Sequence, residues 1–147
     1  MLKTIDPLLG ADLLWMLAAM GHGDDLAVVD DNHPAERIAR ATVSGRLIRM
    51  PGILLPQALK AILTLLPIDD FEPDPIRTMA PVDKRMAQPE VQREVQRLIT
   101  AKIGRGSKLA NLEREAFYRA GEQSFGVVQV GDSRPYGCFL LRKGVIN

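Results

Sequence analysis

The chain has 147 residues, and 46% of them are hydrophobic, which suits one compact domain that buries a substantial core. Its 19 basic and 18 acidic residues nearly cancel, so the formal net charge of +1 excludes the strong field of one sign by which proteins bind nucleic acid or anionic membranes. The single cysteine, Cys138, excludes an intramolecular disulfide, and we expect a cytoplasmic protein in which residues 1–147 form one domain.

The first predicted element is a helix over residues 10–20, which is apolar on every side and is therefore expected to be buried. Gly21 suits its C-cap. A lysine precedes this stretch, as in a signal sequence, but Asp6 and Asp12 interrupt the approach and the uninterrupted apolar run, 13–20, has eight residues. Such a run is far too short to cross a bilayer, so we expect no membrane association.

Short apolar runs predict the first strands. Residues 26–29 lie between two pairs of aspartates and are apolar throughout, as expected of a strand that is covered on both faces. The chain leaves this strand in a turn at residues 32–34. A second strand is expected over 47–50, a long helix over 55–66 and a third strand over 76–80.

The second half of the chain repeats this alternation. An amphipathic helix is predicted from Pro89 to Lys102, because apolar residues recur on one face and a proline suits its start. After it we expect a strand over 108–112, a helix over 113–124, a strand over 125–130 and, beyond a turn, its hairpin partner over 136–141. Six short strands interleaved with four helices predict a three-layer α/β/α fold with a mixed sheet, whose antiparallel part is the terminal hairpin.

His22 is the first candidate for acid–base chemistry. It follows the C-terminus of the first predicted helix, where the helix dipole favours a protonated imidazole, and Gly21 and Gly23 leave its ring uncrowded. A histidine that only caps the helix or faces solvent would explain the position equally well. The local sequence therefore leaves both interpretations open.

Asp30 follows the predicted strand 26–29 and so lies at the edge of an α/β sheet where ligands usually bind. An aspartate that merely caps a solvated turn is the alternative. His22 and Asp30 would lie at opposite ends of this strand, which spans roughly 17 Å. Either the loop from Gly21 folds back or a neighbouring subunit completes the site.

Side chains suited to sugar hydroxyls occur near the end of the chain. Residues 134–138 combine a guanidinium, the phenol of Tyr136 and the glycine Gly137, which allows close approach of a ligand to the backbone before Cys138. An ordinary hairpin whose tyrosine packs at the sheet edge is the alternative, and without other support it is the preferred one.

Three further side chains are possible members of a site. Arg114 and Tyr118 are four residues apart on a predicted helix and share one face, where they either point into a pocket or form a structural pair. His33 precedes a proline in a turn, and we interpret it as pocket lining or surface rather than as a second base.

Several catalytic templates are missing from the sequence. It holds no cysteine or histidine cluster with zinc spacing, no phosphate-binding glycine loop and no nucleophile elbow. We therefore expect neither a metal nor a cofactor. The remaining possibilities are proton transfer without a cofactor and simple binding of a neutral partner.

Motifs at both ends of the chain resemble the RbsD/FucU family, and the match extends over nearly the whole chain. The most specific motifs are the Gly-His-Gly-Asp quartet at 21–24 and the Arg-Lys-Gly-Val ending at 142–145. The glycine after the histidine is similar to the L-fucose branch, because the ribose branch typically carries threonine there. Further matches are residues 1–3, Leu8, Leu9, Asp30, Pro34, Ala35, residues 116–118, Tyr136 and Gly137.

This resemblance implies an aldose mutarotase, an isomerase that interconverts the anomers of L-fucose or a closely related monosaccharide. It also implies a homodecamer of two pentameric rings with sites near subunit boundaries. His22 would be the general acid. The sugar-contacting positions would be Asp30, Arg114, Tyr136, Gly137 and Cys138, with Tyr118 and His33 as weaker candidates.

Two departures from the family pattern bear on specificity. Cys138 stands where the family usually has asparagine, and His33 stands where phenylalanine is common. A thiol forms only weak hydrogen bonds, so a contact between the Cys138 side chain and the sugar would favour a sugar other than fucose, whereas a contact through its backbone alone would change little. A sugar-binding accessory protein of a transport or regulatory system, which has lost turnover, is the second hypothesis, and an oligomeric scaffold with a vestigial pocket is the third.

Overall fold

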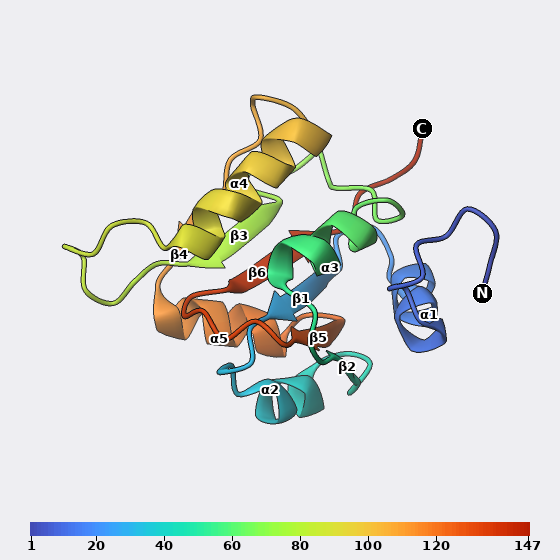
Figure 1. Ribbon diagram of the computed structural model, residues 1–147, viewed down its shortest axis with the longest axis horizontal. Coiled ribbons are helices and arrows are strands. Elements are labelled where there is room, and N and C mark those ends of the chain that lie inside the picture. Colours follow the sequence, from blue (N-terminus) through green and yellow to red (C-terminus); the bar gives the residue numbers. More distant parts are fainter.

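The computed structural model describes residues 1–147 and contains one six-stranded mixed sheet. Its strand order is β2-β5-β1-β6-β3-β4 (Figure 1). Only β6 runs antiparallel to its neighbours, which are β1 and β3, whereas the other pairs are parallel. The strands are β1 (Asp25–Val29), β2 (Leu47–Met50), β3 (Ile76–Met79), β4 (Ala110–Leu112), β5 (Gly126–Val130) and β6 (Cys138–Arg142).

Helices cover both faces of this sheet (Figure 1). The helices are α1 (Ala11–Ala19), α2 (Ala35–Ala41), α3 (Leu55–Ile62), α4 (Glu90–Lys102) and α5 (Arg114–Glu122). Helices α1, α3 and α4 supply one hydrophobic cluster, and α2 and α5 supply the other. The three-layer α/β/α prediction is therefore confirmed.

Strand β1 shows why the run at 26–29 is apolar throughout. Leu26 and Val28 belong to the cluster with α1, α3 and α4, whereas Ala27 and Val29 belong to the cluster with α2 and α5. Successive side chains of a strand point to opposite faces, so a strand with helices on both sides needs apolar residues at every position.

The ends of several helices differ from the sequence-based expectation. Helix α2 was not predicted, because it has only seven residues and directly follows the turn at Pro34. Helix α3 ends at Ile62 instead of residue 66, and α1 is capped by Met20 rather than by Gly21. No helix of the protein is long and apolar enough to span a membrane.

The expected terminal hairpin is wrong. Strands β5 and β6 do not pair, because β1 lies between them. The connection over residues 131–137 must therefore cross the carboxyl end of β1, and Cys138 enters β6 directly opposite Val29. This crossing brings residues 136–138 next to Asp30.

Candidate functional site

A pocket of about 280 Å³ lies at the carboxyl ends of β1 and β3 and at the start of β6. It gathers most of the residues that the sequence singled out, although they come from four distant parts of the chain. Its lining comprises Asp30, Asn32, His33, Met79, Val82, Arg114, Tyr118, Pro135, Tyr136 and Cys138. We call this cavity the Asp30 pocket.

Backbone amides hold the carboxylate of Asp30 in place. Its Oδ1 accepts a hydrogen bond from the Asn32 amide at 2.9 Å, and its Oδ2 accepts one from the Gly137 amide at 3.0 Å. Burial raises the pKa of Asp30, and these amides partly offset the increase. Asp30 is thus a fixed, nearly buried acceptor rather than a solvated turn residue.

Gly137 lets the backbone pass close to Asp30 and to the Leu55 side chain. A Cβ atom at this position would lie 2.3 Å from Cδ1 of Leu55 and 3.3 Å from Cβ of Asp30. The same close approach lets the Gly137 amide reach the carboxylate. Gly137 therefore shapes the pocket through its backbone.

The two positions that depart from the family pattern contact each other. The Cys138 Sγ atom lies 3.3 Å from Nδ1 of His33 and 3.6 Å from Oδ2 of Asp30. Burial, together with the charge of Arg37, lowers the pKa of His33 to about 4, so its ring is neutral at neutral pH. Burial and the neighbouring Asp30 charge raise the pKa of the Cys138 thiol, which is therefore protonated.

Helix α5 presents a cation and a phenol to the same pocket. The Arg114 guanidinium lies 5.6 Å from the centre of the Tyr118 ring, which confirms that the two residues share a helix face. Glu113 begins the helix by accepting hydrogen bonds from the amides of Glu115 and Ala116. This cap fixes the first turn, so Arg114 projects from a defined position at the pocket rim.

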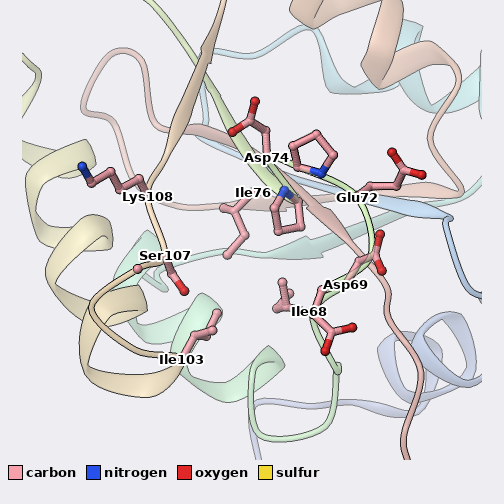
Figure 2. Close-up of a pocket in the computed structure, with 12 residues that line it drawn as sticks. Ile68, Asp69, Glu72, Asp74, Ile76, Ile103, Ser107 and Lys108 are labelled. Carbon is pink, nitrogen blue, oxygen red and sulfur yellow. The ribbon is translucent and has the colours of Figure 1, made fainter.

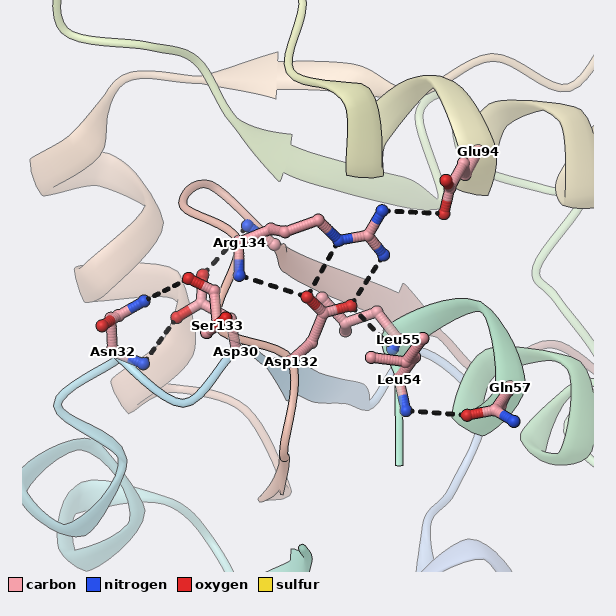
Figure 3. Close-up of polar contacts among 10 residues, drawn as sticks. Asp30, Asn32, Leu54, Leu55, Gln57, Glu94, Asp132, Ser133 and Arg134 are labelled. Carbon is pink, nitrogen blue, oxygen red and sulfur yellow. Dashed lines mark hydrogen bonds and ion pairs between the residues drawn. The ribbon is translucent and has the colours of Figure 1, made fainter. Parts of the chain in front are cut away.

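A buried carboxylate holds the connection that carries Tyr136. Asp132 accepts hydrogen bonds from the backbone and guanidinium of Arg134 and from the Leu55 amide at the start of α3, as Figure 3 shows. Arg134 also pairs with Glu94 of α4 at 3.0 Å. The connection is thereby tied to two helices.

Gln92 completes this support from α4. Its Nε2 donates to the carbonyl oxygens of Met79 and Tyr136, and Tyr136 itself takes a left-handed backbone conformation with φ of 62°. The Tyr136 hydroxyl accepts a hydrogen bond from the Val82 amide. Sequence reasoning missed Asp132 and Gln92, and a polar side chain on the apolar face of α4 was the only signal for Gln92.

His22 does not line the Asp30 pocket. It lies in the loop before β1, at the end of the strand opposite to Asp30, as the spacing predicted. Its Nε2 is 3.2 Å from Oδ1 of Asp69, and the Phe71 ring meets it edge-on. It borders a separate, mainly apolar pocket of about 740 Å³ between α1 and the end of the chain.

A third cavity, of about 410 Å³, has Asp69 among its lining residues (Figure 2). Its lining includes the carboxylates of Glu72 and Asp74 and the ammonium of Lys108, but none of the predicted site residues. No three of the chain's histidine, cysteine, aspartate and glutamate side chains are grouped so as to hold a metal ion. The Asp30 pocket therefore remains the place where the predicted sugar-contacting residues meet.

Comparison with known proteins gives concordant matches over the full length. The model of the RbsD / FucU transport protein family matches residues 3–146. The chain is 38% identical to human "Fucose mutarotase" and 34% identical to "L-fucose mutarotase" of Histophilus somni (strain 2336), with 99% of this chain covered in both cases. These alignments cover 94% and 97% of the two relatives.

A solved structure agrees with these matches. The crystal structure of the fucose mutarotase from Streptococcus pneumoniae in complex with L-fucose superimposes with a TM-score of 0.89 at 29% identity. The superposition covers 99% of this chain and 100% of that one.

Proposed function

Because the chain belongs to the RbsD/FucU transport protein family, we propose that it is a mutarotase that interconverts the anomers of L-fucose or a closely related aldose. The names of relatives that match over nearly the full chain support this activity. The observation that carries the proposal is the Asp30 pocket, in which a fixed carboxylate, a guanidinium and two phenols converge.

In this proposal the pocket residues bind the sugar and His22 transfers the proton. Asp30, Arg114, Tyr136, Gly137 and Cys138 hold the sugar through its hydroxyl groups, with Tyr118 and His33 beside them. His22 is the general acid that protonates the ring oxygen while a base removes the proton of the anomeric hydroxyl. The ring opens and the aldehyde group rotates. The ring then closes by attack on the other face of the aldehyde, which gives the other anomer. Such proton transfer accelerates reactions by about 10²–10⁴-fold.

The position of His22 calls for a second copy of the chain. His22 and Asp30 lie at opposite ends of β1, so one chain alone does not bring them to the same sugar. We propose a homo-oligomer, a decamer of two pentameric rings, in which His22 of one subunit completes the Asp30 pocket of its neighbour. We further propose that residues 1–147 act as one domain and that the protein works in the cytoplasm without a cofactor.

Saturation-transfer NMR tests the proposed activity directly. Exchange between the anomers is measured for L-fucose, D-ribose, D-galactose and their relatives, with buffer alone as the baseline. We expect faster exchange for at least one of these sugars and loss of the acceleration in the His22→Ala variant. No acceleration for any sugar, or full activity in the variant, would refute the proposal.

Sugar binding without turnover is the second candidate, and the contacts of Cys138 favour it. The thiol is engaged by His33 and Asp30, so it offers a sugar less than an asparagine amide would. Tight sugar binding by calorimetry without anomer exchange would support this candidate. Restoration of exchange by Cys138→Asn would then identify the residue responsible.

A further inference from the structure

The ring of His33 is buried beside the Asp30 pocket and has one nitrogen atom without a partner. The residue is 7% exposed and belongs to the lining of the pocket. Its Nδ1 lies 3.3 Å from Sγ of Cys138, whereas its Nε2 has no hydrogen-bond partner in the chain. Because buried polar atoms are nearly always hydrogen-bonded in folded proteins, this nitrogen calls for an explanation.

The neighbours of the ring offer Nε2 no hydrogen bond. The aromatic rings of Phe117 and Tyr118 meet the imidazole edge-on, with their centres 6.0 and 5.5 Å from its own. The guanidinium of Arg37 lies 5.8 Å from the centre of the Tyr118 ring and donates nothing to Nε2. A partner for this nitrogen therefore has to come from a molecule in the pocket that His33 lines.

A chain of polar contacts decides which of the two ring nitrogens carries the proton. Both oxygens of Asp30 accept backbone N–H bonds, which favour the ionised carboxylate, and a carboxylate can only accept. The single proton of the Cys138 thiol therefore points to Oδ2 of Asp30, 3.6 Å away. Sγ then has only a lone pair for His33, so the imidazole proton lies on Nδ1.

A neutral imidazole with its proton on Nδ1 can only accept at Nε2. Burial keeps the His33 ring neutral at neutral pH, because its pKa is lowered to about 4. A hydroxyl group of a ligand satisfies such an acceptor, whereas a methyl group leaves it unpaired. The His33 side of the pocket is thus suited to a hydroxyl group.

The sugar named for the relatives lacks one hydroxyl group. L-Fucose carries a methyl group at C6 where L-galactose carries a hydroxymethyl group, and the two sugars are otherwise identical. Phenylalanine, which is common in the family at the position of His33, suits an apolar group such as this methyl. His33 replaces that apolar ring with a hydrogen-bond acceptor.

We propose that His33 is a specificity-determining residue: its Nε2 accepts a hydrogen bond from a C6 hydroxyl group, so the protein prefers an aldose with the ring configuration of fucose and a free 6-hydroxyl. This inference rests on the proposed mutarotase activity. Cys138 acts as a positioning residue in it, because its contacts with Asp30 and His33 keep the ring in the accepting tautomer.

Anomer exchange of L-galactose and L-fucose tests the inference. Both sugars are measured by saturation-transfer NMR in the same sample, so the ratio of their rates does not depend on how much of a variant is folded. Well below saturation, the wild type should exchange L-galactose about 10-fold faster or more, because L-fucose leaves the buried acceptor unpaired. His33→Phe should reverse this preference. A wild type that does not prefer L-galactose, or an unchanged ratio in His33→Phe, would overturn the proposal.

A matched pair of substitutions tests the part played by Cys138. Cys138→Ser keeps a proton for Asp30 and a lone pair for His33, whereas Cys138→Ala removes both. We expect the preference for L-galactose to persist in Cys138→Ser and to fall in Cys138→Ala. Equal ratios in these two variants would contradict the positioning role of Cys138.

Binding provides a readout that does not require turnover. Long-range ¹H–¹⁵N spectra should show the Nδ1–H tautomer of His33, and saturating L-galactose, but not L-fucose, should shift the Nε2 resonance. The chain has two histidines, so His33→Phe identifies the His33 signals. If neither sugar is accelerated, the mutarotase proposal fails on its own, and the Nε2 shift still decides whether His33 contacts the hydroxyl. The same Nε2 resonance with both sugars would overturn the role of His33.

Discussion

His33 is a neutral imidazole inside the pocket rather than a second acid. Its ring meets Phe117 and Tyr118 edge-on, its Nδ1 contacts Cys138, and its Nε2 is buried without a partner. Protonation would bury a positive charge away from water and close to the charge of Arg37. The ring therefore remains neutral down to a pH of about 4.

This low pKa predicts a specific acid sensitivity. Between pH 6.5 and about 4 the unfolded chain binds a proton at His33 that the folded protein does not. The contribution of His33 to the free energy of unfolding is therefore fully present above this range. It is lost as the pH falls through the range, by about 3 kcal/mol at most. In urea unfolding at a series of pH values, His33→Phe should lose less stability on acidification than the wild type. Equal losses in the two proteins would contradict the assignment.

Individual site residues differ in how far the sequence could reveal them. The sequence predicted the positions of Asp30 and Arg114 in the fold. Asp30 directly follows an apolar strand, and Arg114 lies at the start of a predicted helix. Asp69 could not be predicted as the partner of His22, because 47 residues separate them and only the backbone pairing with residues 142–144 brings them together. The contact between His33 and Cys138 was equally invisible, since it spans 105 residues.

At the level of elements, the connection over residues 131–137 is the part on which the pocket most depends. It carries Tyr136 and Gly137 across the end of β1, and Asp132 is the buried group that ties it to α3. The sequence predicted a simple turn here, because hairpins are the commonest link between consecutive strands. Strand β1 pairs with both β5 and β6, and the local sequences of these strands do not reveal this arrangement.

Asp132→Ala should therefore destabilise the protein. The substitution leaves the buried Leu55 amide without a partner and removes the guanidinium contacts, which should lower the free energy of unfolding by about 2 kcal/mol or more. Asp83→Ala is a matched control, because Asp83 binds Arg85 through the same kind of local contacts on the exposed surface. We expect the control to unfold like the wild type in urea. Equal effects of the two substitutions would refute a structural role for Asp132.

At the scale of the whole molecule, the separation of His22 from the Asp30 pocket predicts complementation between inactive subunits. His22→Ala removes the acid and Arg114→Ala impairs the pocket, so each variant alone should be nearly inactive. In oligomers formed from an equal mixture, about a quarter of the sites should combine an intact His22 with an intact pocket. Anomer exchange is measured before and after the two variants are unfolded and refolded together. Absence of recovered activity in mixed oligomers would show that each site lies within one chain.

The order of the strands has a consequence for synthesis on the ribosome. Strand β6 is the last to be made, yet it lies between β1 and β3 and is the only link between the half-sheets β2-β5-β1 and β3-β4. Until residues 138–142 emerge, β1 and β3 each expose an unpaired edge, which other chains can pair with. The two half-sheets can therefore join into one sheet only after residues 138–142 have been translated.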